Sequence, residues 1–286
     1  MKVLGIDIGG TNLRVGLVEN NVVVRIESLK IKKDGRETEI IDDLNLLIGQ
    51  FLNEKIDGIG IGVPSLVDPE KGIVYDATNI PAWKKVHLKE QIEAKNGIPV
   101  YVNNDANCFV MGEKYFGRVK VYSNIVGLII GTGLGSGLVL NNHLYLGENC
   151  GAGEFGMIPF RNHNFEYYCS GQFFKNEYGV SGEEIKQRAE ISDAEALEIF
   201  AQFGSNLGEA IKVIMLAVDP EIFILGGSVS KSYGFFKDAM WESIRKFLYV
   251  HSSDKIKVEV SEINYVAILG AAALYYDALK NNSISK

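Results

Sequence analysis

The chain has 286 residues, of which 47% are hydrophobic and 23% charged, and its formal net charge is −7. This length suits two domains with sizeable cores, and the acidic balance argues against nucleic acid as a partner. No apolar run is long enough for a membrane span, no signal peptide is recognisable, and three scattered cysteines make no disulfide framework, so we expect a cytoplasmic protein without a membrane partner.

The first half of the chain opens as strand, turn, strand rather than as strand, turn, helix. Apolar runs predict strands, and apolar residues at helical spacing predict one helix. In chain order these are strands at Val3–Ile8, Leu13–Val18 and Val22–Ile26, a helix over Ile40–Phe51, and strands at Asp57–Pro64 and Val100–Val102.

The second half repeats this opening. A strand, a glycine-rich turn and a second strand are followed by long helical and further strand patterns. The predicted elements are strands at Asn124–Ile130, Leu138–Leu140 and Leu144–Leu146, a helix over Ala194–Val218, strands at Ile222–Leu225 and Ile256–Val260, and a terminal helix over Val266–Leu279.

The first motif that can carry chemistry follows the first strand. Gly9 and Gly10 let the backbone turn sharply, so that N–H groups face an anion, and Thr11 adds a hydroxyl donor. Asp7 could hold a hydrated Mg²⁺, which binds through few carboxylates and several waters. The alternative is a plain hairpin turn with an exposed aspartate.

The second motif is the segment Gly131–Gly137, with four glycines in seven residues between two apolar strands. Glycine inside a hairpin weakens it unless something must approach the backbone closely. The segment is neither a Walker loop nor a Rossmann fingerprint, because no Gly-Lys-Ser/Thr follows and the next element is a strand. We therefore expect Gly131, Thr132, Gly133 and Gly135 to bind phosphate.

A third glycine turn, Gly226–Ser228, follows a later strand. Alone it indicates only a turn. As a third glycine turn at a strand end, it could let a nucleotide base and ribose lie against the backbone at Gly227.

The segment Asn103–Asn107 contains a candidate base. Phosphoryl transfer to a hydroxyl needs positioning, charge neutralisation and a carboxylate that accepts the hydroxyl proton. Asp105 fits that role, and Asn104 can hydrogen-bond a neighbouring hydroxyl. The alternative is an N-cap for a helix that begins near Ala106.

Glu154 and Glu166 are candidates for holding a polyol, because carboxylates accept hydrogen bonds from vicinal hydroxyls. Glu154 lies in a glycine-rich segment. For any single glutamate, a solvated loop position is the alternative.

Together these motifs resemble the ROK family of the sugar kinase/actin/Hsp70 superfamily, over nearly the whole chain. The matching segments, in the family's order, are Gly5–Val18, Gly62–Pro64 with Val67–Asp68, Asn79–Ile80 and Trp83, Asn104–Asn107, Gly131–Gly137, and Ala152–Gly156. Glu166–Gly171 also resembles a family stretch that contains a sugar-binding glutamate.

The resemblance implies an α/β fold of two ribonuclease-H-like (actin-like ATPase) lobes with sugar and ATP in the cleft between them. It implies transfer of the ATP γ-phosphate to a hexose hydroxyl, usually the 6-hydroxyl, with Asp105 as base. Sugar would be bound by Asn104, Asp105, Glu154 and Glu166. The expected domains are residues 1–108 plus 266–286 and residues 109–265, and a homodimer is expected.

Two departures from the family concern the sugar site. The family usually places a histidine that binds zinc and sugar where this chain has Met157, and the cysteine-rich zinc loop that follows is missing. Cys150, His163 and Cys169 do not have a standard zinc spacing, so we expect no zinc site. Ser65 stands where the family usually has glycine.

Three functions follow from the resemblance. A hexose kinase is favoured, with glucose as the first substrate to test and N-acetylmannosamine as the second. A sugar-responsive repressor is disfavoured, because the first phosphate motif begins at residue 5 and leaves no room for a DNA-binding segment. A catalytically weak sugar-binding or regulatory protein is the alternative that Met157 motivates.

Overall fold

The computed structural model describes residues 1–32, 35–77, 80–148 and 150–284, with side chains up to residue 280. The chain forms two compact units. Unit 1 comprises Met1–Val121, Leu146–Ala152 and Glu262–Lys286, and unit 2 comprises Tyr122–Tyr145 and Gly153–Ser261. The domain boundaries expected from the sequence stay a prediction. Among the described helices, none has both the length and the apolar character of a membrane span.

Unit 1 is built on a five-stranded sheet of order β3-β2-β1-β4-β8. The first three strands are antiparallel, and β4 and β8 continue parallel to β1. The strands are β1 (Lys2–Ile8), β2 (Asn12–Glu19), β3 (Val22–Lys30), β4 (Gly58–Val63) and β8 (Val100–Asn104). The predicted strand–turn–strand opening is therefore confirmed.

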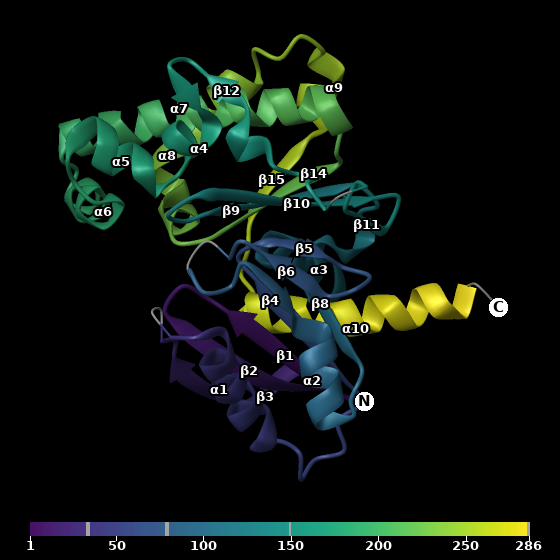
Figure 1. The fold of residues 1–286 in the computed structure, drawn as a ribbon. Helices are drawn as coiled ribbons and strands as arrows, with labels where there is room; N and C mark the ends of the chain where they lie inside the picture. The colour runs from purple at the N-terminus through teal and green to yellow at the C-terminus, as the bar shows by residue number, and fades with distance from the viewer. Residues whose placement is uncertain (33–34, 78–79, 149, 285–286) are drawn as a thin grey trace. The chain divides into compact units, whose positions relative to one another are not determined.

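Four longer helices cover this sheet: α1 (Glu37–Gly49), α2 (Leu88–Asn96), α3 (Asp105–Phe116) and α10 (Val266–Ile284). Helix α10 contacts α3, β1 and β4, and Figure 1 shows it in yellow beside these strands. The approach is close because the strands present glycines to it. A Cβ on Gly60 would lie 1.8 Å from the carbonyl oxygen of Ala271, and one on Gly5 would lie 2.0 Å from that of Ile268.

A small antiparallel sheet of β5 (Leu66–Asp68), β6 (Ile73–Tyr75) and β7 (Lys85–His87) leads into α2. It supplies Val67, Val74 and Val86 to the core that also contains the large sheet and α1. A short 3-10 helix, η1 (Arg118–Val121), follows α3.

Unit 2 has a five-stranded sheet with the corresponding order, β11-β10-β9-β14-β15, and again the first three strands are antiparallel and the last two parallel to β9. The strands are β9 (Ile125–Ile130), β10 (Leu134–Leu140), β11 (His143–Tyr145), β14 (Ile222–Gly226) and β15 (Lys257–Val260). The same strand pattern in both units confirms the predicted α/β fold of two ribonuclease-H-like units.

The remaining elements of unit 2 are the hairpin β12 (Pro159–Phe160) and β13 (His163–Asn164), the helices α4 (Phe165–Cys169), α5 (Gly171–Tyr178), α6 (Gly182–Glu190), α7 (Ala194–Val218), α8 (Tyr233–Ile244) and α9 (Val250–Lys255), and the 3-10 helices η2 (Phe155–Met157) and η3 (Val229–Ser232). Helix α7 packs along α8 (Figure 1). Stacked and edge-on rings of Phe174, Phe200, Phe203 and Phe236 join α5, α7 and α8.

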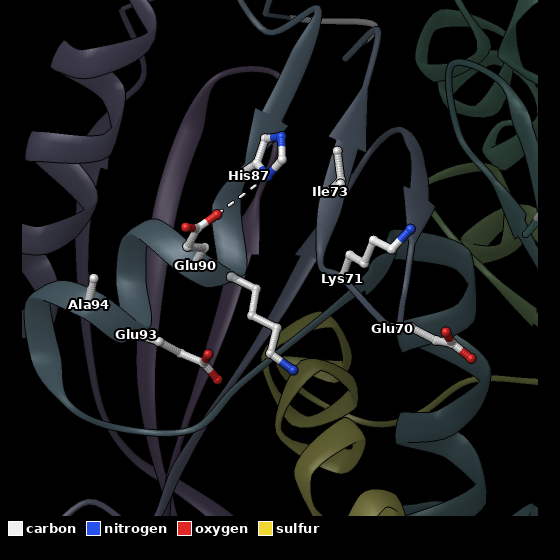
Figure 2. A pocket seen from close by; sticks show the side chains of 8 residues that line it. Glu70, Lys71, Ile73, His87, Glu90, Glu93 and Ala94 are labelled. Carbon is white, nitrogen blue, oxygen red and sulfur yellow. Dashed lines mark ion pairs between the residues drawn. The ribbon is translucent and has the colours of Figure 1, made fainter.

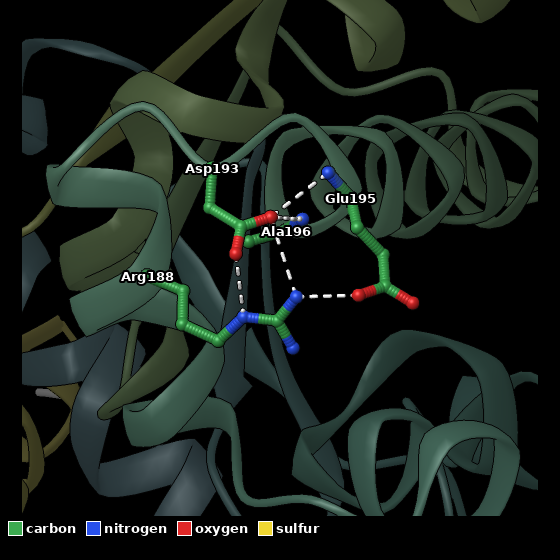
Figure 3. A network of polar contacts seen from close by, with 4 residues as sticks. All are labelled: Arg188, Asp193, Glu195 and Ala196. Carbon is green, nitrogen blue, oxygen red and sulfur yellow. Dashed lines mark hydrogen bonds and ion pairs between the residues drawn. The ribbon is translucent and has the colours of Figure 1, made fainter.

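The turn between α6 and α7 is held by an ion-pair network (Figure 3). The Arg188 Nε donates to Asp193 at 2.9 Å, and its guanidinium also pairs with Glu195. Asp193 caps α7, because its Oδ1 accepts from the backbone N–H groups of Glu195 and Ala196. The guanidinium lowers the pKa of Asp193. This network fixes the point at which α7 begins after α6. Residues of both helices line a cavity that is described below.

Candidate active site

The first glycine turn of unit 1 joins β1 to β2. The Gly9 N–H donates to the Asn12 carbonyl at 3.0 Å, and the Thr11 carbonyl accepts from the Ile31 N–H at 2.9 Å. A Cβ on Gly9 would meet only the Asn12 carbonyl oxygen, at 3.5 Å. The backbone at Gly9 is thus open to close approach, while Gly10 and Thr11 complete the turn.

Asp7 lies in β1 opposite Arg14 of β2. Its side chain is 18% exposed, and its Oδ2 is 3.7 Å from an Arg14 guanidinium nitrogen. Loss of solvation raises the Asp7 pKa, and the positive charge of Arg14 opposes that rise. A largely buried carboxylate beside an open glycine turn is a suitable ligand for a hydrated Mg²⁺.

Asn104 and Asp105 lie where β8 ends and α3 begins. Asn104 is the N-cap of α3, because its Oδ1 accepts from the Ala106 N–H at 2.8 Å. Its Nδ2 donates to the Ser65 carbonyl at 3.1 Å. Asp105 is the first residue of α3, where the helix dipole favours a negative charge. The capping alternative is therefore correct for Asn104, and it places Asp105 at the positive end of the helix.

Ser65 is buried, and its hydroxyl donates to the Tyr75 carbonyl of β6. Its own carbonyl holds the Asn104 side chain. The serine that departs from the family's glycine therefore ties the small sheet to the start of α3. Nearby in the sequence, Trp83 is buried, whereas Asn79 lies outside the described residues.

Asp7 and Asp105 both act on the buried thiol of Cys108 in α3. Burial raises the Cys108 pKa well above its usual value, and the negative charges of Asp105 and Asp7 raise it further. The predicted base Asp105 and the predicted Mg²⁺ ligand Asp7 therefore act electrostatically on the same thiol of unit 1.

The glycine-rich segment of unit 2 differs in part from the prediction. Only residues 131–133 form the turn, because β10 begins at Leu134 and Gly135 pairs with Ile129 inside the sheet. The backbone of Gly135 and of the residues after it pairs with β9, so the strand continues through this segment. Glycine can pair in this way, although it weakens a strand. Gly135 is thus a strand residue rather than part of an extended turn.

The turn is held from one side by the junction of α4 and α5. The Gly171 N–H donates to the Gly131 carbonyl at 2.7 Å, and the Ser170 hydroxyl donates to the Thr132 carbonyl at 3.1 Å. Ser170 is fully buried and is also the N-cap of α5. A Cβ on Gly131 would meet no atom within 4 Å, so its other side is free.

A cavity of ≈ 500 Å³ in unit 2 adjoins this turn. It is lined by Gly131, Thr132, Gly171, Gln172, Phe174, Lys175, Asn176, Ser181, Gly182, Glu183, Phe200, Ser228, Val229 and Ser232. The third glycine turn adjoins it: Gly227 has φ +88, and a Cβ there would lie 2.3 Å from the Ile130 carbonyl oxygen. The cavity therefore brings the second and third glycine turns together.

The walls formed by α5 and α6 were missed in the sequence. Ser170 and Ser181 are the N-caps of these helices, and each accepts from a backbone N–H in the first turn. A serine before each helical pattern was a usable signal for two helix N-termini. No sequence pattern indicated that Gln172 and Lys175 would face the same cavity as Gly131.

Glu154 and Glu166 both lie in unit 2, and the charge of Glu166 acts on Glu154. The Glu166 Oε2 accepts from the Leu134 N–H at 3.0 Å, and its Oε1 accepts from the Gln172 Nε2 at 3.2 Å. Partial loss of solvation raises the pKa of Glu154, and the negative charge of Glu166 raises it further by a smaller amount. The solvated-loop alternative is therefore wrong for Glu166, which is bonded to the glycine turn.

The segment that replaces the family's zinc loop is an aromatic hairpin. Met157 is half-exposed, with its sulfur 4.0 Å from the Asn164 amide nitrogen. His163 stacks on Tyr167 with ring centroids 3.9 Å apart. Cys169 is buried in unit 2, and Cys150 belongs to unit 1. Within the described ranges, no three metal-binding side chains cluster, and the absence of zinc stays a prediction.

A second hollow, of ≈ 670 Å³, lies in unit 1 beside α2. His87 Nδ1 lies 3.4 Å from a carboxylate oxygen of Glu90. Figure 2 shows this pair together with Lys71 and Glu93, which line the same hollow. As far as the structure describes the chain, this lining contains none of the predicted site residues. Its acids and bases are mixed, which is typical of a solvated surface.

Comparison with known proteins identifies the family. The ROK family profile matches residues 3–278. The glucokinase of Thermotoga maritima is 26% identical and covers 96% of this chain and 97% of its own length. The xylose repressor of Bacillus subtilis is 27% identical, with 96% of this chain and 77% of the repressor covered. The crystal structure of a ROK family glucokinase from Streptomyces griseus, in complex with glucose and AMPPNP, superposes with a TM-score of 0.80 at 25% identity, over 96% of this chain and 99% of that one.

Proposed function

The chain belongs to the ROK family, and from this premise we propose that it is an ATP-dependent sugar kinase that transfers the γ-phosphate to a hexose hydroxyl. The observation that carries the proposal is the cavity of ≈ 500 Å³ in unit 2, lined by Gly131, Thr132 and Ser228. It places open glycine backbone beside a hollow of the size that a nucleoside needs. The similarity to a glucokinase with bound glucose and AMPPNP supports the same assignment.

We assign the nucleotide to this cavity. The base and ribose would lie against the turn at Gly227 and the walls formed by α5 and α6. The phosphates would approach the N–H and the hydroxyl of Thr132 across the open face of Gly131, since such donors suit an anion. The N–H of Gly131 itself donates to the Gly133 carbonyl at 3.0 Å. Lys175 on the wall adds a positive charge in the same cavity. Gly133 closes the turn by accepting the Gly131 N–H, and Gly135 belongs to the strand that follows.

The base and the second phosphate contact would come from Asp105 and from the glycine turn at residues 9–11. Asp105 accepts the proton of the sugar hydroxyl while the oxygen of that hydroxyl attacks the γ-phosphorus. The bond between the γ-phosphorus and the bridging oxygen breaks, and ADP leaves. Asn104 orients a neighbouring hydroxyl with the amide hydrogen that does not bind Ser65. Gly10 and Thr11 provide donors for phosphate oxygens, while Gly9, whose N–H donates to the Asn12 carbonyl, leaves room for phosphate to approach.

Asp7 is the residue that would hold Mg²⁺, through water. Bound Mg²⁺ neutralises phosphate charge in such reactions. The burial of the carboxylate fits this role, because a cation nearby would offset the lost solvation that raises the Asp7 pKa. The expected dependence is loss of turnover with excess chelator and recovery with added Mg²⁺.

Glu154 and Glu166 would accept hydrogen bonds from the sugar. Glucose is our first choice of substrate, with phosphorylation at the 6-hydroxyl, and N-acetylmannosamine is the second. Met157 has no imidazole to offer a sugar hydroxyl, so we expect contacts with one end of the sugar to be fewer than a histidine would give. A weakly catalytic sugar-binding protein is the competing proposal, which the similarity to a repressor supports.

A coupled assay of ADP release on a panel of hexoses and N-acetylhexosamines tests the proposal. We expect turnover with at least one sugar and a kcat lower by about 10²- to 10⁴-fold with Asp105→Asn. Binding of a sugar without turnover of any would favour the competing proposal. Absence of both binding and turnover would remove the kinase assignment.

The same assignment carries two expectations about the protein in the cell. We expect it in the cytoplasm, where ATP and hexoses are available, and we expect a homodimer. Light scattering on the eluted protein would give the mass of the assembly, for comparison with the 31.5 kDa of one chain. Gel-shift binding to DNA at physiological salt is not expected.

A further inference from the structure

The carboxylate of Glu166 is already engaged before any sugar arrives. It accepts from the Leu134 N–H and from the Gln172 side chain, at 3.0 and 3.2 Å. A carboxylate has about four acceptor positions, so two remain for sugar hydroxyls. Glu166 can therefore contact a sugar and the glycine turn at the same time.

Gly133 shows how closely this carboxylate approaches the turn. A Cβ on Gly133 would lie 2.5 Å from the Glu166 Oε2, which is closer than real Cβ contacts. The contrast with Gly131, whose added Cβ would meet no atom within 4 Å, divides the roles of the two glycines. Gly131 leaves room for a ligand, and Gly133 leaves room for Glu166.

The backbone of Leu134 contacts both segments that carry the glutamates. Its N–H is held by Glu166, and its carbonyl oxygen would lie 2.6 Å from a Cβ on Gly156, in the turn that follows Glu154. The Ser136 hydroxyl, two residues further along β10, donates to the Gly153 carbonyl. The start of β10 is therefore packed against Glu166 and against the segment that carries Glu154.

Gln172 extends the connection to the nucleotide cavity. It donates to Glu166 and lines the cavity together with Gly131 and Thr132. A shift of the Glu166 carboxylate would change the support of the turn and the position of this wall residue. A single side chain, that of Gln172, therefore connects the proposed sugar contact Glu166 with the cavity.

Helix α4, which carries Glu166, is held on its other side. The Asn164 Oδ1 accepts from the Tyr167 N–H at 2.9 Å, and the Phe165 N–H donates to the Ile158 carbonyl at 3.1 Å. Phe165 also stacks on Phe160 with centroids 4.6 Å apart. The backbone of Glu166 is thus fixed, and its side chain is the part that can respond to a ligand.

We propose that Glu166 is a positioning residue that couples sugar binding to nucleotide binding, by anchoring the glycine turn through the Leu134 N–H and orienting Gln172 on the cavity wall. The proposal rests on the kinase assignment above. Sugar hydroxyls that donate to Glu166 and Glu154 fix the Glu166 carboxylate in the position that holds the turn, so sugar strengthens nucleotide binding, and nucleotide strengthens sugar binding by the same factor.

Calorimetric titration of AMPPNP, with and without saturating sugar, tests the coupling. In the unsubstituted protein we expect sugar to lower the nucleotide Kd by about 10-fold, within the usual range of such couplings. In Glu166→Ala the ratio of the two Kd values falls to about one, and the Kd without sugar rises several-fold because the turn loses its anchor. Gln172→Ala retains the Leu134 anchor and gives an intermediate ratio.

Two further variants separate positioning from folding. Glu166→Gln keeps an oxygen for the Leu134 N–H, and we expect it to restore the Kd without sugar to within about twofold while the coupling stays reduced. Glu190→Gln removes an exposed carboxylate of unit 2 that does not line the cavity, and should change neither value. Thermal melting of each variant reports its fold.

The outcomes are distinguishable. If the unsubstituted protein turns over sugar and both Glu166→Ala and Glu166→Gln keep its Kd ratio, the coupling role is refuted and the kinase assignment stands. If the unsubstituted protein neither turns over nor binds sugar, the kinase assignment fails and the coupling role fails with it. A ratio of about one in the unsubstituted protein refutes the coupling alone.

Discussion

The contrast between Gly131 and Gly133 gives a matched pair of substitutions that separates ligand binding from folding. Gly131→Ala adds a methyl group that meets no atom within 4 Å, at a position where no positive φ is required. Such a change is neutral or stabilises by about 0.4–1 kcal/mol, because alanine restricts the unfolded chain. The folded protein should therefore melt at the same temperature or slightly higher.

The same methyl group should impair nucleotide binding. It would stand beside the backbone that we assign to phosphate and prevent close approach there. One hydrogen bond to a charged group contributes about 1.5–3 kcal/mol, which corresponds to a rise in the KM for ATP of roughly 10- to 150-fold. Measuring ADP release against ATP concentration, at saturating sugar, gives this KM.

Gly133→Ala should do the reverse in its effect on folding. Its Cβ would lie 2.5 Å from the Glu166 Oε2, so the carboxylate must move and the Leu134 N–H loses its partner. We expect a lower free energy of unfolding by about 1–3 kcal/mol. If Gly131→Ala leaves the KM for ATP unchanged while the protein stays folded, phosphate does not approach this turn and our placement of the nucleotide is wrong.

Three further predictions concern the base, the sugar contact and the fold. Asp105→Asn should lower kcat by about 10²- to 10⁴-fold in the ADP-release assay while sugar binding, measured by calorimetry, changes little; unchanged kcat would exclude Asp105 as base. Lost solvation and the charge of Glu166 raise the Glu154 pKa above 4.5, so Glu154 is protonated at a higher pH than an ordinary glutamate. The KM for sugar should therefore rise as pH falls through that raised pKa, and Glu154→Gln should remove this dependence. A KM for sugar that is constant with pH would contradict the contact. Gly60→Ala places a Cβ 1.8 Å from the Ala271 carbonyl and should lower the free energy of unfolding by about 3 kcal/mol in urea titrations, whereas Gly49→Ala, with no atom within 4 Å, should not; equal stability of the two would contradict the close packing of α10.

The sequence predicted the strands of both five-stranded sheets, because apolar runs of that length and their glycine turns are local signals. It did not predict the short strands β5–β7 and β12–β13. Helix Ala194–Val218 was predicted with the bounds that the structure has. The turn predicted for residues 131–137 was too long, because glycines that pair in a strand and glycines that form a turn look the same in a sequence. The pairing of Gly135 with Ile129 depends on β9, which precedes it.

The sequence predicted those parts of the site in which the type of residue indicates its chemistry. It could not predict those parts in which the role of a residue depends on neighbours that only the fold brings near. Asp105 was recognised as a carboxylate at a helix start. The attachment of Glu166 to Leu134 could not be predicted, because 32 residues separate them and only the fold brings them together. The same applies to Gln172, which no motif singled out.

Capping and catalysis at Asn104 and Asp105 were alternatives in the sequence, but the structure makes them compatible. The Asn104 Oδ1 caps α3, and its Nδ2 donates to the Ser65 carbonyl, which holds the end of β8 against the small sheet. This fixes the backbone from which Asp105 projects at the positive end of α3, where the helix dipole favours a negative charge. The cap therefore contributes to the proposed chemistry by positioning the Asp105 carboxylate. Asn104→Ala should therefore lower both the stability of α3 and kcat, whereas Asp105→Asn should lower kcat alone.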